Sequence, residues 1–283
     1  MRLTPQTTQR IVFGLLTAAT VLVVIPLFFL VGYIVVQGMG TISWQFIVDM
    51  PRNGMRGGGI FPAIVGTLLL TLGTAVFSVP IGIGGGIYLA EYSADTALTR
   101  AIRLSIINLA GVPSVVYGLF GLGLFVLFLQ FGTSILAGSL TLGILSLPVI
   151  ISTSEEAIRS VPQGFRLVNA AVGGTKWQGI RHIVLPQALP GIITGVILGL
   201  ERAAGETAPI LFTVAAFFLP RLPHSVFDQT MALPYHLFVI STQVPRMPVQ
   251  IQYGTALVLL AFVLSMNLSA TLIRRHYRRQ RQW

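Results

Sequence analysis

Long apolar runs, separated by short polar segments, make up most of this chain. Uncharged runs extend from Ile11 to Val48, from Gly57 to Ala90 and from Leu104 to Ser154. Further apolar stretches extend from Gln187 to Pro220 and from Val249 to Ile273. A transmembrane helix needs about 20 mainly apolar residues, so each run is long enough to cross a bilayer.

The third run is too long for one helix, and the polar residues 130–134 divide it. The pattern predicts an all-α, polytopic membrane protein with six transmembrane helices, at 11–36, 60–90, 104–130, 135–153, 189–218 and 252–273. Segment 1–59 would hold the first helix and first external loop. Segment 60–274 would be the transmembrane core with an inner loop at about 154–186, and 275–283 a basic tail.

Composition supports this class. Hydrophobic residues make up 54% and charged residues 9% of the chain, and the mean hydropathy is +0.82, which excludes a water-soluble or disordered protein. The first apolar stretch is longer than a signal-peptide core of roughly 7–15 residues, so it is expected to remain as a helix. Without cysteine, disulfides and thiolate metal sites are excluded.

Basic residues predict the orientation. Thirteen fall on the side of the termini and four on the other, which favours cytoplasmic termini. The thirteen are Arg2, Arg10, Arg100, Arg103, Arg159, Arg166, Lys176, Arg181, Arg274, Arg275, Arg278, Arg279 and Arg281; the four are Arg52, Arg56, Arg221 and Arg246. The net charge of +10 then reflects topology, with no nucleic-acid partner, and the basic tail suits anionic membrane lipid.

The fifth predicted span contains three charged residues, Glu201, Arg202 and Glu206. A charge at the bilayer centre costs about 3 kcal/mol, so such residues usually face a pathway or a partner. Arg202 is predicted near the midplane, where its guanidinium fork would match the oxygens of a multivalent anion. Glu206 follows one turn later and would hold Arg202 between passages; a purely structural ion pair is the alternative. Glu201 points elsewhere and is expected to be protonated or paired with a cation of another subunit.

The inner loop has two short amphipathic pieces. Phe165, Val168 and Val172 recur at helical spacing, Gly173 and Gly174 break the pattern, and a second piece begins at Trp177. Such a hinged, basic and apolar unit could fill a groove on a cytoplasmic protein or lie on the membrane surface, and periodicity leaves both open.

Glycine and proline positions add detail to the spans. Gly82 with Gly86, and Gly195 with Gly199, have the spacing that permits close helix approach, and packing inside the chain is the favoured role. Pro113 and Pro209 are expected to kink spans three and five. Ser114, Tyr117 and Thr207 lie near these kinks and would line the path.

The loop also carries a family motif. Nine residues after Gly173 the chain continues Ile183-Val184-Leu185-Pro186, which resembles the cytoplasmic motif of binding-protein-dependent ABC importer permeases. The Glu-Ala-Ala of that motif is replaced by Leu167-Val168-Asn169. The resemblance implies coupling to an ATPase through Arg166, Gly173, Lys176, Trp177, Ile183, Leu185 and Pro186.

From about residue 60 onward the chain resembles PstA-type permease subunits of phosphate ABC importers. The resemblance rests on Gly66-Thr67, on residues 87–92 (IYLAEY), on residues 111–120 (GVPSVVYGLF) and on residues 202–209 (RAAGETAP). It implies a type I importer core in a bacterial or archaeal plasma (inner) membrane. It also implies a second homologous permease subunit, a cytoplasmic ABC ATPase dimer and an external phosphate-binding protein.

No phosphate-binding loop occurs in the sequence, so ATP and Mg²⁺ are expected to be used by the partner ATPase, and this chain to bind no cofactor. The four histidines lack metal-ligand spacing, and no catalytic grouping is apparent. The predicted function is phosphate import through a path including Arg202, Glu206, Glu201, Thr207, Ser114 and Tyr117. Alternatives are a permease for sulfate or molybdate, an ion-coupled secondary carrier with Arg202 and Glu206 as a proton relay, or a sensor of phosphate supply.

Overall fold

The computed structural model describes residues 5–171 and 173–279. Val172 of the predicted amphipathic pattern, Arg2 and Arg281 lie outside these residues. The helices are α1 (Pro5–Gly38), α2 (Trp44–Val48), α3 (Phe61–Ile87), α4 (Ala97–Ala110), α5 (Ser114–Gly121), α6 (Ile135–Arg159), α7 (Gln163–Ala171), α8 (Lys176–Gly179), α9 (Leu185–Gly205), α10 (Ala208–Thr213), α11 (Leu233–Thr242) and α12 (Val249–Arg279).

Shorter elements join these helices. A 3₁₀ turn, η1 (Met39–Thr41), follows α1, and the strands β1 (Pro51–Arg52) and β2 (Gly57–Gly58) form an antiparallel pair. Three π-helical segments continue α3, α5 and α8: η2 (Tyr88–Tyr92), η3 (Leu122–Phe128) and η4 (Ile180–Val184).

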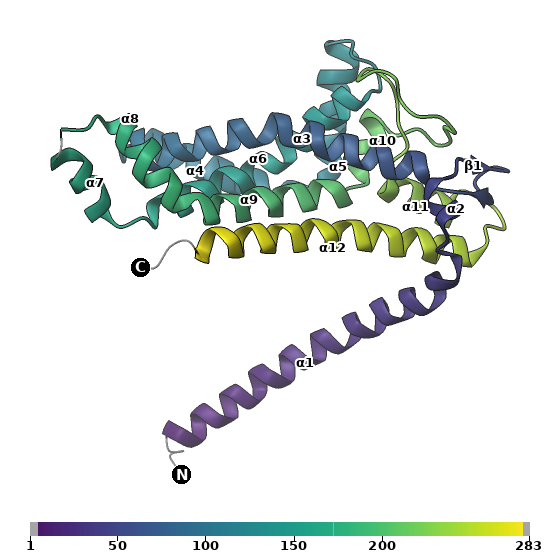
Figure 1. Cartoon of the computed structure of the whole chain (residues 1–283), viewed down its shortest axis with the longest axis horizontal. Coiled ribbons are helices and arrows are strands. Elements are labelled where there is room, and N and C mark those ends of the chain that lie inside the picture. The colour runs from purple at the N-terminus through teal and green to yellow at the C-terminus, as the bar shows by residue number, and fades with distance from the viewer. Residues whose placement is uncertain (1–4, 172, 280–283) are drawn as a thin grey trace.

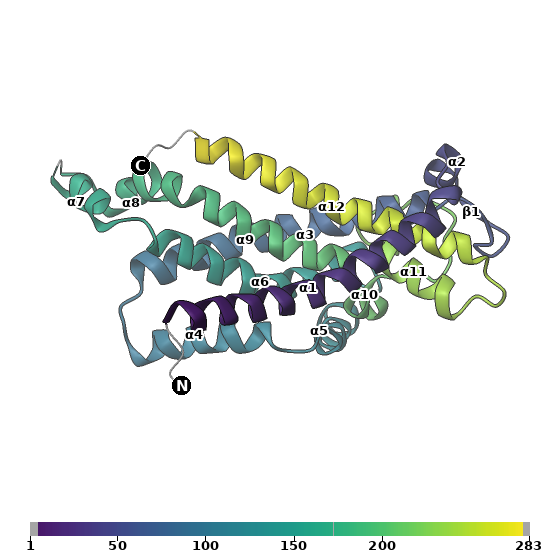
Figure 2. The ribbon, with the colours of Figure 1, turned by 90° about the horizontal axis from the view of Figure 1, so that it is seen from below.

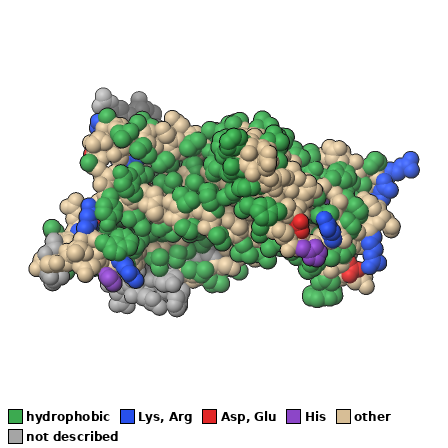
Figure 3. Space-filling model, turned by 90° about the horizontal axis from the view of Figure 1, so that it is seen from above, with side chains coloured by type: hydrophobic (Ala, Val, Ile, Leu, Met, Phe, Trp, Pro, Cys, Tyr) green, Lys and Arg blue, Asp and Glu red, His purple; other side chains and the backbone are tan. Residues whose placement is uncertain are grey.

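The arrangement is that of a membrane protein. Five helical stretches of the described chain are long and apolar enough to cross a membrane, or six if a bent pair counts as one span. Figure 3 shows hydrophobic side chains over the middle of one face, with Lys and Arg side chains gathered towards its two ends. An apolar belt between charged ends fits a bilayer-spanning bundle.

The third predicted span is wrong as a single continuous helix. Helix α4 and the stretch Ser114–Phe128 meet at a bend of 100°. Pro113 lacks an N–H and disfavours helical backbone before it, so the helix stops there. The Tyr117 hydroxyl donates a hydrogen bond to the Leu109 carbonyl oxygen at 2.8 Å and ties the two arms together across the bend. The kink expected at Pro113 is therefore a break.

The fifth predicted span is displaced. A single helical stretch runs from Lys176 through η4 and α9 to Gly205, starting thirteen residues before the predicted position 189 and stopping before 218. The piece beginning at Trp177 is thus no separate short helix. Pro209 lies in the first turn of α10, where its missing N–H costs nothing, so the break precedes it at Glu206 and Thr207.

Glycines let three helices pack closely at the centre of the bundle. A Cβ on Gly82 or Gly199 would press on Ile150 of α6, and one on Gly86 on Ser154 of the same helix. Gly195 faces Thr153, also on α6. Both predicted glycine pairs therefore serve packing inside the chain, of α3 and of α9 against α6.

The bundle has two distinct ends (Figure 1). Helices α7 and α8 lie at one end, here called the α7 end; α11, α2 and the strands lie at the other, the α11 end. The start of α1 and the close of α12 also lie towards the α7 end, which the sequence predicts to be cytoplasmic. Helix α12 runs beside α9 in both Figure 1 and Figure 2. Helix α1 instead diverges from the bundle, and no residue of its most apolar 18-residue segment is buried inside the structure.

The segment between α10 and α12 is ordered, as its prolines suggest. Six residues of α11 are buried: Leu233, Pro234, Tyr235, His236, Val239 and Ile240. The Thr67 hydroxyl of α3 accepts a hydrogen bond from the Leu233 backbone N–H at 2.8 Å, which satisfies an N–H at the start of α11. Gly66 leaves room for the Met231 carbonyl oxygen beside it.

Candidate functional site

Arg202 lies in the last turn of α9, not in the middle of a span. A cation there is favoured by the negative end of the helix dipole. Glu206 caps the same helix in extended backbone conformation, and its Oε1 lies 3.5 Å from Arg202 Nε. The Arg202 side chain is 37% exposed and that of Glu206 18% exposed. The pair predicted from the sequence is present, but it spans a helix end and is loosely held.

Glu201 has a neighbour within this chain. Its Oε2 accepts a long hydrogen bond, 3.5 Å, from the Asn267 side-chain amide of α12. Its other carboxylate oxygen is buried without a hydrogen-bond partner in the described chain. Glu201 thus has a different neighbour from Arg202. A cation from another subunit at this oxygen remains a prediction.

The remaining predicted path residues come from two short helices that pack together. Ser114 begins α5, half-buried, and Tyr117 on its next turn is buried. Thr207 precedes α10. A Cβ on Gly118 would lie 3.0 Å from the Ala208 carbonyl oxygen, so α5 and α10 approach closely beside these residues. Tyr117 uses its hydroxyl to bridge the α4–α5 bend, a structural contact that the sequence did not reveal.

A small, mostly apolar cavity lies beside Glu206. It is lined by Thr67, Leu70, Thr71, Leu142, Ala203, Ala204, Glu206, Ile210, Ala232 and Pro234. About 10 Å³ is open to the centre of a water molecule, close to the room that one water needs. Thr67 and Thr71 bring hydroxyls to the same cavity as Glu206, so α3 and the end of α9 share this site.

At the α7 end, the inner loop presents an apolar surface. Leu167 is 69%, Val168 60% and Trp177 51% exposed. Phe165 instead packs inward against the core cluster around Ile158, which the helical pattern alone did not separate from Val168. Gly173 adopts φ +75°, a left-handed conformation that favours glycine, and so supports the predicted break between α7 and α8.

The other predicted coupling residues lie around this break. Lys176 places its ammonium 5.0 Å from the centroid of the Tyr92 ring, a cation–π contact. Ile183 lies in η4, and Leu185 and Pro186 begin α9; all three are half-buried.

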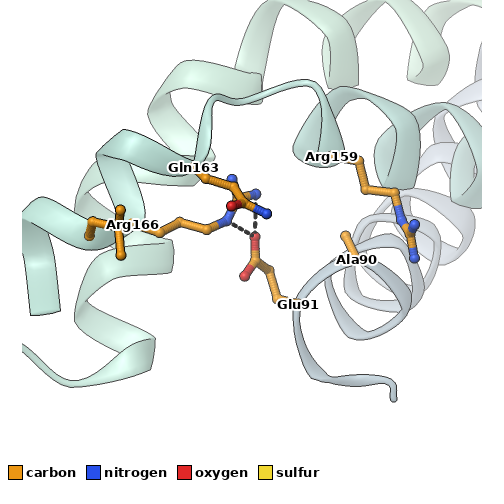
Figure 4. Close-up of a pocket in the computed structure, with 6 residues that line it drawn as sticks. Ala90, Glu91, Arg159, Gln163 and Arg166 are labelled. Carbon is orange, nitrogen blue, oxygen red and sulfur yellow. Dashed lines mark hydrogen bonds and ion pairs between the residues drawn. The ribbon is translucent and has the colours of Figure 1, made fainter. Parts of the chain in front are cut away.

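Arg166 is the most heavily bonded of the predicted residues. Its Nε and Nη2 donate to Glu91 Oε1 at 3.0 and 2.7 Å, Nη1 donates to the Val161 carbonyl at 2.6 Å, and Nη2 to the Ile158 carbonyl at 2.9 Å. Figure 4 shows the Arg166 side chain pointing at Glu91 beside a pocket that Gln163 also lines. Glu91 is 75 positions away in sequence, so no local pattern indicated this partner.

A second ion-pair network lies next to the first. Glu155 Oε1 accepts a hydrogen bond from Arg103 Nε at 2.8 Å and forms an ion pair with Arg159, whose Nε lies 3.0 Å away. Both arginines also donate to the Leu89 carbonyl oxygen in η2. Arginines of α4, α6 and α7 thus converge on η2, directly or through a carboxylate. Sequence analysis placed Arg103 and Arg159 in the orientation count only and assigned Glu155 no role.

Residues 82–282 match the family described as the binding-protein-dependent transport system inner membrane component. That match covers more than half of the chain. The chain belongs to this family.

Full-length relatives agree with this assignment. The probable ABC transporter permease protein YqgI of Bacillus subtilis is 35% identical over 272 residues, which is 91% of each chain. The phosphate transport system permease protein PstA 1 of Mycobacterium tuberculosis H37Rv is 34% identical, over 90% of this chain and 83% of the relative.

The fold is shared with solved importers. A chain of a bacterial ABC transporter involved in alginate import aligns with a TM-score of 0.65 at 16% identity, over 96% of this chain and 99% of that one. This protein is therefore a permease subunit of an ABC importer, a multi-pass protein of the bacterial inner membrane. In such importers ATP hydrolysis belongs to a separate ATPase, which works with a second permease and a substrate-binding protein.

Proposed function

We propose that this permease imports inorganic phosphate, and that Arg202 contacts the anion during its passage. The observation that carries the proposal is the state of Arg202, a partly exposed guanidinium at a helix end whose ion-pair partner, Glu206, lies 3.5 Å away. A guanidinium stays charged and offers a planar fork of donors that matches phosphate oxygens. Relatives whose names state phosphate transport add support.

Glu206 would compete with the anion for Arg202. Arginine–carboxylate hydrogen bonds usually measure about 2.7–2.9 Å, so the 3.5 Å separation indicates a contact that opens easily. Glu206 would hold the guanidinium when no anion is present and release it on arrival. Repulsion between Glu206 and the anion would also keep phosphate from being trapped.

The partners follow from the same proposal. A second, homologous permease subunit would complete the path, and an external phosphate-binding protein would deliver the anion at the α11 end. A dimer of cytoplasmic ATPases, using ATP and Mg²⁺, would dock on the exposed surface of Leu167, Val168 and Trp177 at the α7 end. The permease itself would bind no cofactor, and its basic tail would meet anionic lipid.

Substitution of Arg202 tests the proposal in the reconstituted complex. Losing a charge-assisted pair costs roughly 1.5–3 kcal/mol, so Arg202→Gln should lower ATP-dependent phosphate uptake by about 10- to 100-fold or more. Arg202→Lys keeps the charge without the fork and should fall between Gln and wild type. Arg100→Gln, an exposed arginine of α4, is the matched control and should transport normally.

Copurification of the partner subunits and of the ATPase must be unchanged in all three variants. Normal uptake by Arg202→Gln would refute the role of Arg202. Uptake of sulfate or molybdate by the wild-type complex, with no uptake of phosphate, would instead refute the substrate.

A further inference from the structure

The end of α3 is attached to three neighbouring helices by arginines. Arg103 of α4 and Arg159 of α6 donate to the Leu89 carbonyl oxygen of η2, at 3.0 and 3.4 Å. Arg166 of α7 reaches η2 only through the side chain of Glu91. The Glu91–Arg166 ion pair is therefore a charged connection between η2 and the helix that carries the exposed apolar surface.

The Glu91–Arg166 pair is short and well shielded. Glu91 is 8% and Arg166 28% exposed, and the closest N–O distance is 2.7 Å. A shielded ion pair with several hydrogen bonds is strong and directional. The same guanidinium also donates to the Val161 and Ile158 carbonyl oxygens where α6 ends. Arg166 is thereby fixed in orientation, and displacement of α7 must displace Glu91 or break the pair.

Helix α7 has the geometry to receive a displacement. Its Leu167 and Val168 side chains face outward, while Phe165 packs inward on the core. A partner that pushes on Leu167 and Val168 would therefore move α7, and Arg166 on the same helix would move with it.

Helix α3 has the length to carry that displacement to the other end. Thr67 lies 24 residues before Glu91 in one helical stretch, about 36 Å along its axis. Thr67 and Thr71 line the cavity that Glu206 also lines. One continuous helical stretch thus has Glu91 near one terminus and the Arg202–Glu206 region beside the other.

We infer that the Glu91–Arg166 ion pair is the link through which movement of the docked α7 surface displaces α3 and thereby the Arg202–Glu206 region. This inference rests on the proposed docking of the ATPase at α7 and α8. Glu91 is accordingly a positioning residue for transport, with no direct contact to the anion or to ATP. Loss of the link should uncouple ATP turnover from uptake without dissociating the complex.

Glu91→Gln is the sharpest variant, because Arg166 keeps its two carbonyl acceptors. In reconstituted complexes with the ATPase, the second permease and the binding protein, we expect phosphate uptake to fall about 10-fold. ATP turnover should persist, so the number of anions moved per ATP should fall by the same factor. Glu156→Gln removes an exposed carboxylate of α6 and should leave this ratio unchanged.

A crosslink separates a moving link from a merely stabilising contact. Because the chain has no cysteine, Glu91→Cys combined with Arg166→Cys creates a single reactive pair in this subunit. The double variant should be uncoupled when unmodified. A short bismaleimide that joins the two thiols should restore uptake, since a covalent bond then replaces the ion pair. The partner subunits are used in cysteine-free form.

The outcomes are distinct. Coupled uptake by Glu91→Gln would overturn the inference, as would a crosslink that forms but blocks or fails to restore uptake. Loss of the ATPase from the Glu91→Gln complex would also overturn it, because Glu91 would then act in docking. The docking proposal is tested separately by Trp177→Ala. If this variant leaves ATPase copurification and turnover unchanged, docking at α7 and α8 is wrong, and the inference falls with it even if Glu91→Gln is uncoupled.

Discussion

The two ends of the bundle hold their arginines in different ways. At the α7 end, Arg166 is bonded at 2.6–3.0 Å to a carboxylate and two carbonyl oxygens. Towards the α11 end, Arg202 lies 3.5 Å from Glu206 and is 37% exposed. A guanidinium that already makes four short hydrogen bonds must give some of them up to bind an incoming anion, whereas a loosely paired one loses little. This difference fits the roles proposed above, in which the α7 end transmits movement and Arg202 exchanges Glu206 for the anion.

The two ends also differ in the kind of contact that holds their segments together. Charged contacts converge on η2 at the α7 end, whereas α11 is held by buried apolar side chains and by a neutral hydrogen bond from Leu233 N–H to Thr67. Neutral packing is insensitive to salt, while partly exposed ion pairs weaken as salt screens them. Stability at the two ends should therefore respond differently to the same perturbations.

The largest effect is expected at the α11 end, from Gly66→Ala. A Cβ at this position would overlap the Met231 carbonyl oxygen, and backbone cannot move aside as a flexible side chain can. Overpacking of this kind costs about 3 kcal/mol, so the thermal unfolding temperature of the purified complex should fall clearly. Gly84→Ala on the same helix has no atom within 4 Å of the new Cβ and should be neutral or slightly stabilising. Equal behaviour of the two variants would show that the α11 segment is not packed tightly on α3.

An intermediate effect is expected at the α7 end, from Glu155→Gln. This change leaves Arg103 and Arg159 without their shared anion, which should cost about 2 kcal/mol at low ionic strength. The difference from wild type should shrink in high salt, unlike that of Gly66→Ala. Thermal unfolding at a low and a high salt concentration measures the loss of stability and its dependence on salt, and Glu156→Gln, at an exposed position, is the control. A salt-independent loss would mean that Glu155 acts through packing.

The smallest effect at neutral pH is expected from His236. Burial in α11 lowers the pKa of this imidazole to about 4, from 6.5. Well above pH 6.5 His236 is neutral in both the folded and the unfolded chain, so its titration should not change the free energy of unfolding there. As the pH falls from about 6.5 to 4, only the unfolded chain gains the proton, so the free energy of unfolding should drop by up to about 3 kcal/mol.

Measurements of the free energy of unfolding between pH 7 and 4 test this prediction. His236→Leu is expected to reduce the dependence of that free energy on pH. His224→Leu, an exposed histidine of the preceding loop, should keep it. If the His224 variant loses the dependence instead, the buried imidazole is not its source.

The sequence predicted the helical membrane bundle well and its breaks poorly. Runs of apolar residues placed the stretches around α3, α6 and α12, because the bilayer imposes length and hydropathy on each span. The chain is apolar on both sides of Pro113 and of Glu206. Hydropathy therefore could not show that the chain turns by 100° at the first position and stops being helical at the second.

The residues of the candidate site were likewise predictable only in part. Arg202 and Glu206 were found because charge is rare in an apolar run and because they are four residues apart. Glu91 and Arg166, and Glu201 and Asn267, are joined only by the tertiary fold, across 75 and 66 positions. Local spacing carries no information about such pairs, and their partners became visible only in the structure.

The unbroken helical stretch from Lys176 to Gly205 has a mechanical consequence. Its 30 residues span about 45 Å, while the hydrocarbon core of a bilayer is about 30 Å thick, so roughly 15 Å projects beyond it. If the α8 end is the part that projects, a tilt of the helix pivots at the membrane surface and moves the projecting residues like a lever arm. A tilt of about 10° would then swing Lys176 sideways by nearly 3 Å, while Arg202 beyond that pivot moves the opposite way.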